Sequence, residues 1–129
     1  MNKIHLNNLN LKTLTEQNIL DYCLLNNINL SDIEELDLGF NYIVDISEIK
    51  IFKNIKTLIL NNNLILNISV LKNLKYLEKL YIGFNKIKDI SLIQYLNNLY
   101  ELDINNLILN LNQIQYINKC KNLKILWCY

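Results

Sequence analysis

Hydrophobic residues recur along this chain with a period of 22 residues. The segments 33–54, 55–76 and 77–98 align without gaps, the segment 99–122 aligns with two extra residues, and a partial copy follows at 123–129. Within each repeat, counted from its first residue, apolar side chains occupy positions one, four, six, eleven, seventeen and twenty. In the third repeat these residues are Leu77, Leu80, Ile82, Ile87, Ile93 and Leu96.

This spacing predicts a strand, a turn and a short helical segment in every repeat. Around positions four and six, apolar and polar residues alternate, which is the pattern of a strand with one buried side. Positions seventeen and twenty are three residues apart, as the inward side of a helical turn requires. No single repeat can bury its own apolar edge, so we expect the repeats to stack with parallel strands about 4.8 Å apart.

An asparagine column accompanies this pattern at position nine. An amide side chain donates and accepts hydrogen bonds at once, so it can satisfy the backbone groups of a buried turn. The sequence therefore predicts that these asparagines are buried and bonded to backbone groups of adjacent turns. The column contains Asn41, Asn63 and Asn85.

Serine and glycine also recur at fixed positions. Serine at position fifteen is expected to cap the short helical turn through its hydroxyl group. Gly39 and Gly83, at position seven, are expected to let the backbone turn beside Phe40 and Phe84. The serines are Ser47, Ser69 and Ser91.

The fourth repeat departs from the pattern. Leu107 stands where the column predicts asparagine, and we place the two extra residues between Leu109 and Ile117, which puts Cys120 at the inward twentieth position. A tolerated loop variation is favoured over a functional loop. The candidates for the missing amide are Asn105, Asn106 and Asn110.

The first 32 residues are expected to form an irregular first repeat and a helical cap. The stretch "LNNLNL" at Leu6 still fits the strand pattern, and a helix is predicted after it, with Thr15 as N-cap and with Asn26 or Asn27 at its end. Leu14 and Ile19 are placed to form a hydrophobic staple. The predicted apolar side of this helix consists of Ile19, Leu20, Cys23 and Leu24.

The pattern L-x-x-L-x-L-x-x-N-x-L resembles the leucine-rich repeat. The repeat length and the "I-x-D-I-S" stretch are similar to a short class found in phosphatase-regulating repeat proteins and bacterial internalins. The resemblance covers residues 33–129 well and 1–32 loosely. It implies one α/β domain, a solenoid with a parallel concave β-sheet and short helical or irregular convex segments. Members of this class bind very different proteins, so it implies a protein partner of unspecified identity.

Composition narrows the function classes. A net charge of +1 gives no general attraction to nucleic acid or anionic membranes, and no apolar run approaches the roughly 20 residues of a membrane span. We read no secretory signal. The three cysteines, none at C-x-x-C spacing, indicate neither a disulfide framework nor a zinc site, and favour a reducing, cytoplasmic location.

Candidate chemistry is sparse. His5 has no acid or nucleophile pair near it in the sequence, and the two glycines form no phosphate-binding loop. Carboxylates gather in the first and fourth repeats, but an open curved sheet offers no pocket for a catalytic pair. We therefore expect no enzyme activity, no metal and no cofactor.

The expected binding surface is the concave face, which we define as the side chains at positions three, five and seven of the repeats. Aromatic and apolar residues on it are flanked by carboxylates, which indicates a partner with an apolar anchor beside lysine or arginine. Scattered surface aromatics without function are the alternative. The candidate partner-binding residues are Glu35, Asp37, Ile59, Lys79, Tyr81, Glu101, Asp103, Ile125, Trp127 and Tyr129.

A structural role is the alternative function. The strand of the partial repeat presents an unpaired edge at Trp127–Tyr129, and unpaired edges pair readily with other chains. The expectation is a homo-oligomer through this C-terminal edge, or a longer natural protein in which another domain joins there.

Overall fold

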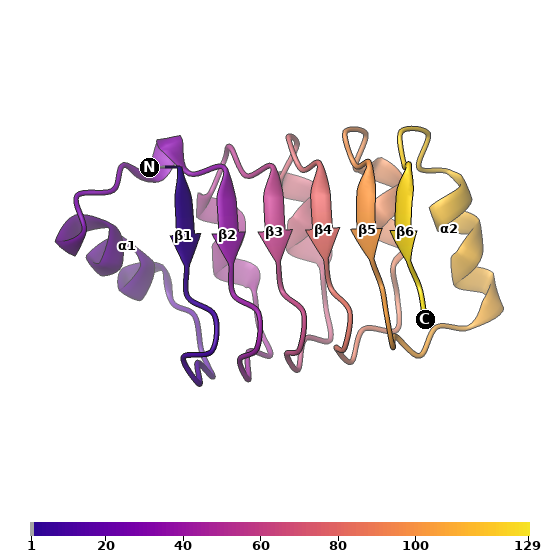
Figure 1. Ribbon diagram of the computed structural model, residues 1–129, viewed down its shortest axis with the longest axis horizontal. Helices are drawn as coiled ribbons and strands as arrows, with labels where there is room; N and C mark the ends of the chain where they lie inside the picture. The colour runs from indigo at the N-terminus through magenta and orange to yellow at the C-terminus, as the bar shows by residue number, and fades with distance from the viewer. Residues whose placement is uncertain (1) are drawn as a thin grey trace.

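Six short parallel strands form one sheet in the computed structural model, which describes residues 2–129. The strands lie side by side in chain order, with a helix at the N-terminal end and the return segments behind the sheet (Figure 1). They are β1 (Lys3–His5), β2 (Glu35–Asp37), β3 (Thr57–Ile59), β4 (Lys79–Tyr81), β5 (Glu101–Asp103) and β6 (Ile125–Trp127).

The register of the sheet follows the repeat. Glu35 pairs with Thr57 and Thr57 with Lys79, one repeat apart each time. The first step is longer, from Lys3 to Glu35, and the last step, from Glu101 to Ile125, contains the two extra residues of the fourth repeat. The predicted solenoid with a parallel sheet is confirmed.

The return segments are mainly 3-10 helices. The segments η2 (Ser47–Ile51), η3 (Ser69–Asn73) and η4 (Ser91–Tyr95) follow the second to fourth strands. Two further short 3-10 helices are η1 (Leu30–Asp32) and η5 (Leu111–Gln113), and α2 (Ile114–Asn118) continues η5. Positions seventeen and twenty point inward as predicted, and the core lies between these segments and the sheet. These residues are Ile49, Phe52, Leu71, Leu74, Ile93 and Leu96, all buried.

The predicted serine caps are wrong. Each serine begins its 3-10 helix, but its hydroxyl makes no cap bond to the helix. The residue two positions earlier accepts the serine backbone N–H instead: the distances are 2.8 Å to Asp45 Oδ1, 2.7 Å to Asn67 Oδ1 and 2.8 Å to Asp89 Oδ1. Position thirteen therefore holds the return segment in place.

The asparagine column forms with the predicted bonds, and Asn41 and Asn63 are buried, whereas Asn85 is partly buried. Asn63 is buried; its Nδ2 donates to Leu38 O at 2.9 Å and Leu60 O at 3.0 Å, and its Oδ1 accepts from Ile43 N at 2.9 Å. Asn41 and Asn85 bond to their own and the preceding repeat in the same way. The column joins each turn to its predecessor.

The expected replacement amide in the fourth repeat is not found at the column. Asn105 lies in the turn that follows β5, and its Oδ1 accepts instead from Tyr129 N, after β6, at 2.7 Å. Gln113 Oε1 accepts from Ile90 N at 2.8 Å, so a different side chain joins the third and fourth repeats here. Cys120 and Ile117 pack against the core as partly buried residues.

The N-terminal helix α1 (Glu16–Leu25) covers the first end of the stack (Figure 1). Thr15 is its N-cap, accepting from Asn18 N at 3.2 Å, and Asn26 is its C-cap, both as predicted. The predicted apolar side is only partly right. Cys23 and Ile19 are buried, but Leu20 is 41% exposed and Leu24 is 81% exposed, because the helix contacts the solenoid along a narrow line.

The glycines do not make the turns. Neither glycine has a positive φ; the left-handed residue is the next one, at position eight. Asparagine tolerates this conformation, but a phenylalanine in it is unusual. The position-eight residues with positive φ are Asn8, Phe40, Asn62, Phe84 and Asn106.

Candidate protein-binding face

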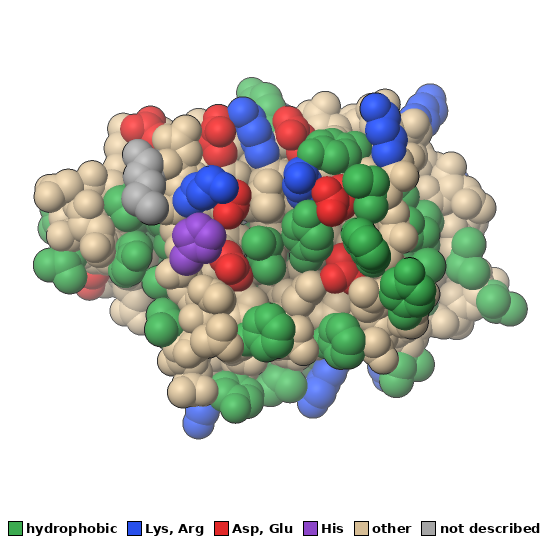
Figure 2. Space-filling view, in the orientation of Figure 1, with side chains coloured by type: hydrophobic (Ala, Val, Ile, Leu, Met, Phe, Trp, Pro, Cys, Tyr) green, Lys and Arg blue, Asp and Glu red, His purple; other side chains and the backbone are tan. Residues whose placement is uncertain are grey.

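The concave face is the side of the sheet that no return segment covers. The strands β1 to β5 share one arrangement, with the middle residue buried in the core and the first and third side chains on this face. Charged side chains gather over β1 and β2, while hydrophobic side chains gather over β4 to β6 (Figure 2). The sheet therefore brings the predicted binding residues of all repeats onto one surface.

Ion pairs run along the first column of this face. Lys3 Nζ lies 2.7 Å from Glu35 Oε2, and Lys79 Nζ lies 3.3 Å from Glu101 Oε2. The four carboxylates and these two lysines leave an excess of two negative charges on the face when His5 is neutral. The face is acidic, although two of its carboxylates already have partners.

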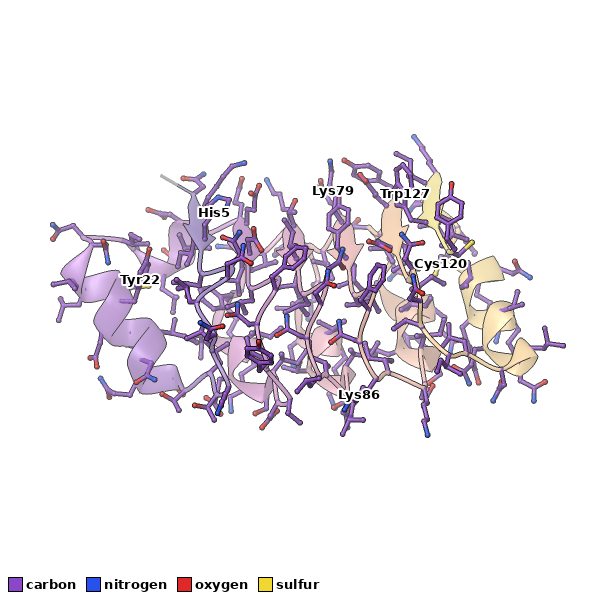
Figure 3. All side chains as sticks on the ribbon, turned by 60° about the horizontal axis from the view of Figure 1, so that its bottom comes forward. His5, Tyr22, Lys79, Lys86, Cys120 and Trp127 are labelled. Carbon is purple, nitrogen blue, oxygen red and sulfur yellow. The ribbon has the colours of Figure 1, made fainter. Side chains whose placement is uncertain are left out.

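His5 is not isolated, contrary to the sequence-based expectation. Its Nε2 is 3.6 Å from Glu35 Oε1 and its Nδ1 is 3.6 Å from Asp37 Oδ2. The long first repeat places it beside acids that are 30 or more positions away in the sequence, which local reading missed. It forms the N-terminal margin of the concave face (Figure 3).

A small charged cluster surrounds Tyr81. Burial, and then the neighbouring Glu101 carboxylate, raise the pKa of the Tyr81 hydroxyl to about 12. Burial acts to raise the pKa of Glu101, but contacts with Tyr81 and Lys79 outweigh it and hold this pKa below its usual range. The aromatic ring thus stands among groups whose charges are fixed at neutral pH.

Asp103 is the most buried of the predicted binding carboxylates. It is only 7% exposed, and its carboxylate accepts from Asn61 Nδ2 at 2.8 Å and from Asn105 N at 2.8 Å. Asn61 and Asp103 belong to repeats that are not adjacent, and Gly83 lies between them, donating its N–H to Asn61 Oδ1 at 2.9 Å. Asp103 therefore organises the face rather than offering a free charge to a partner.

Exposed apolar surface increases toward the C-terminal end of the face. Ile59 and Tyr81 are half-buried, whereas Ile125 is 39% exposed, Trp127 44% and Tyr129 87%. Trp127 projects from β6 on the same side as Lys79 on β4 (Figure 3). The aromatic side chains of the concave face thus lie over β4 to β6, and the most exposed of them are at its C-terminal end.

Two exposed aromatics escaped the sequence analysis as candidates. Phe40 is 58% exposed and Phe84 is 48% exposed, both beside the concave face in the turns that follow β2 and β4. The available signal was the residue type at position eight, where the other repeats have asparagine and these two have phenylalanine.

Within residues 2–129, no three His, Cys, Asp or Glu side chains are grouped so that they could hold a metal ion. In the same part of the chain, no helix is long and apolar enough to cross a membrane.

Comparisons with known proteins find leucine-rich repeats. The family model described as "Leucine Rich repeats (2 copies)" matches residues 53–92. No curated protein sequence matches the chain. Among solved structures, an internalin (inlF) of Listeria monocytogenes is 30% identical, with a TM-score of 0.71. The match covers 76% of this chain and 29% of the internalin chain.

Two further structures show the same architecture. Internalin C2 of the same organism is 29% identical with a TM-score of 0.72, covering 77% of this chain and 43% of its own. A leucine-rich repeat protein of Leptospira interrogans is 27% identical with a TM-score of 0.69, covering 95% of this chain and 35% of its own.

The chain spans less than half the length of each of these similar structures. The repeat pattern, the parallel sheet, the asparagine column and these matches agree with one another. The chain belongs to the leucine-rich repeat family.

Proposed function

We propose that this chain binds a protein partner on its concave face and does so without catalysis. Leucine-rich repeat proteins generally mediate protein–protein interactions. The observation that carries the proposal is the gathering of half-buried Tyr81 and exposed Trp127 and Tyr129 over β4 to β6. Tyrosine and tryptophan are the residue types most enriched at binding hot spots, and here they share one face with the acidic columns.

The charges support a partner of particular chemistry. The face as a whole carries an excess of two negative charges, with Glu101 beside the aromatic residues and with Glu35 and Asp37 on β2. A partner with an apolar anchor beside lysine or arginine complements both features. A cytoplasmic location is part of the proposal; the three cysteines are unpaired, as a reducing compartment requires.

The test is a double variant of the concave face. A partner is first captured from the source organism, identified by mass spectrometry and purified. Tyr81→Ala with Trp127→Ala should then weaken its affinity by roughly 2 kcal/mol or more, because both side chains are expected to be contact anchors. Isothermal titration calorimetry measures this change, and circular dichroism checks that the fold persists.

A matched control comes from tyrosines outside the concave face. Tyr76 is 56% exposed and Tyr95 is 69% exposed, so Tyr76→Ala with Tyr95→Ala removes similar aromatic area elsewhere. This variant should bind normally. Equal affinity of the concave-face variant and the wild type would refute the proposal.

One observation favours self-association as a second candidate function. Leu126 occupies the inward position of β6, yet it is 39% exposed, whereas its counterpart Leu102 is fully buried. A second copy paired along β6 would cover this residue and the strand edge. Light scattering across a concentration series tests it, and a constant monomer mass would exclude it.

A further inference from the structure

A second surface lies outside the concave face, along the turns that follow the strands. We define the loop edge as the side chains at positions eight, ten and twelve of the four full repeats. Many of its members are large, apolar and exposed, and Figure 2 shows hydrophobic side chains along the rim beyond the ends of the strand arrows of Figure 1. The exposed apolar residues are Phe40, Tyr42, Val44, Leu66, Phe84 and Ile108.

Grouped exposed apolar residues on a soluble domain mark interaction surfaces more often than scattered ones do. Ile108 is 89% exposed and Leu66 is 56% exposed, so neither contributes much to the core. The loop edge therefore holds apolar area that folding alone does not explain.

Two of these residues also hold a strained backbone. Phe40 has φ of 55° and Phe84 of 56°, in the left-handed region that disfavours bulky side chains. The equivalent residues Asn62 and Asn106 show that asparagine fits this turn. Phenylalanine at these positions is thus unfavourable in both conformation and exposure, a combination typical of sites retained for binding.

The charge of the loop edge has the opposite sign to that of the concave face. Residues 40–44, 62–66, 84–88 and 106–110 contain no Asp or Glu, and their only charged residues are Lys86 and Lys88. Both lysines are exposed, and among residues 2–129 neither forms an ion pair with a carboxylate. Lys86 projects from the rim, away from Lys79 on the concave face (Figure 3).

The lysines border a hollow. It has a volume of about 270 Å³ and is lined by Leu66, Asn85, Lys86, Ile87, Lys88 and Ile108. Leu66 and Ile108 belong to the repeats on either side of the lysines, so the third repeat forms a basic floor between two apolar walls. A single large apolar side chain fits such a hollow, with carboxylates reaching the lysines beside it.

We propose that the loop edge is a second binding surface, which takes an acidic peptide segment of a partner protein with a large apolar side chain in this hollow. The two lysines favour a negatively charged partner, and the apolar walls favour a large apolar side chain as its anchor. The surface is separate from the concave face, so one partner could occupy each.

Other ligand classes fit less well. Attachment to anionic membranes typically requires clusters of four to eight basic residues, and two lysines fall short of that. Nucleic-acid binding likewise relies on many phosphate contacts from lysine and arginine. A protein segment needs only a few charges beside an apolar anchor, which is what the loop edge offers.

The experiment uses a phage-displayed library of random peptides, selected on the wild-type chain, with the selected peptides resynthesised for fluorescence anisotropy. We expect enrichment of peptides with two or more Asp or Glu beside Leu, Phe or Trp. Lys86→Glu with Lys88→Glu should weaken their binding about tenfold or more, and Ile108→Ser should weaken it several-fold. All three side chains are exposed, so the fold should persist.

Two controls separate this surface from the rest of the molecule. Lys121→Glu with Lys124→Glu makes the same change in net charge elsewhere and should leave binding unchanged. Tyr81→Ala with Trp127→Ala should also leave it unchanged, which distinguishes the loop edge from the concave face.

Selection of basic or uncharged peptides would overturn the proposal, as would equal loss of binding in the two lysine variants. Binding to phosphatidylserine vesicles that depends on Lys86 and Lys88, without any acidic peptide being selected, would overturn it in favour of a membrane surface.

Discussion

At the residue scale, Gly83 decides whether the polar network under the concave face can form. An added Cβ there would lie 2.9 Å from Asp103 Oδ1 and 3.0 Å from Asn105 O, one of which is a backbone atom that cannot easily move. Asn61 bonds to Asp103 across the space that this glycine leaves empty. Glycine is therefore required here because a Cβ would not fit, and not because of the backbone conformation, since its φ is not positive.

Gly83→Ala is expected to destabilise the fold by about 1–3 kcal/mol, because Asp103 and the adjacent strand must shift. Urea unfolding measures this change. Gly39→Ala is the matched control at the same repeat position, where the nearest atom would be Asp37 Oδ1 at 3.2 Å and the others would be 3.5 Å away. It should change stability by less than about 1 kcal/mol, and equal effects in both variants would contradict this account.

The asparagine column gives a second prediction at this scale. Asn63→Leu would leave Ile43 N without an acceptor inside the core, and it would remove one of the two amide donors to each of Leu38 O and Leu60 O. The expected cost is about 1–3 kcal/mol, measured by thermal or urea unfolding. Asn97→Leu, at an exposed position, should be nearly neutral; a wild-type midpoint for Asn63→Leu would show that the column is not structural.

Sequence alone could predict this column but not the Asp103 network. Asn63 sits in register with Asn41 and Asn85, so its role follows from repetition. Asn61 and Asp103 are joined across an intervening repeat, and the contact exists only because position seven of that repeat lacks a side chain. A repeat pattern describes neighbours one period apart, and it does not show such exceptions.

At the element scale, the return segments depend on the acceptor at position thirteen. The first N–H of each 3-10 helix donates to the side chain at this position, which is Asp45, Asn67 or Asp89. An amide oxygen and a carboxylate oxygen are therefore equivalent acceptors here. Only the carboxylate can lose this ability by protonation. Hydrogen bonding from the Ser91 backbone N–H, and then from its hydroxyl, holds the pKa of Asp89 below its usual value.

Asp89→Ala should therefore cost about 0.5–2 kcal/mol near pH 7, the range for loss of a cap acceptor. Because the folded-state pKa is depressed, the stabilisation is complete above the unfolded-state value of about 3.9 and is lost as the pH falls through the folded-state pKa. Asp89→Asn should keep the cap at every pH, as Asn67 does in the preceding repeat.

The measurement is urea unfolding of the wild type and both variants from pH 7 to pH 3. The difference between the wild type and Asp89→Asn should shift in favour of the variant below about pH 4. A difference that stays constant over this range would show that Asp89 does not stabilise the segment through its charge.

Elements were predictable wherever a period determined them. The strands, the inward positions seventeen and twenty, and the cap at Thr15 all follow from apolar spacing and a local cap signal. The prediction of serine caps failed because the recurring serine lies two residues after the true acceptor, and recurrence alone does not say which of two nearby polar residues makes the bond. The prediction for α1 was wrong at Leu20 and Leu24 because apolar residues extend beyond the narrow side of the helix that contacts the solenoid.

At the scale of the whole molecule, burial is uneven along the stack. The inward residues of β2 to β5 are at most 1% exposed, whereas Leu126 of β6 is 39% exposed. In a linear repeat array each unit is stabilised mainly by its neighbours, and β6 has a neighbour on one side only. Local opening should therefore require the least free energy at β6.

Amide hydrogen exchange can test this gradient with matched backbone bonds. Lys79 N donates to Lys56 O at 2.9 Å, and Ile125 N donates to Tyr100 O at 3.0 Å. The two amides therefore have nearly equal hydrogen bonds and differ mainly in how well the neighbouring repeats bury their strands. At low protein concentration, Ile125 should exchange at least about tenfold faster than Lys79, because β6 opens without disturbing the inner repeats. Equal protection of the two amides would contradict the gradient, and protection of Ile125 that rises with protein concentration would instead indicate that a second copy pairs with β6.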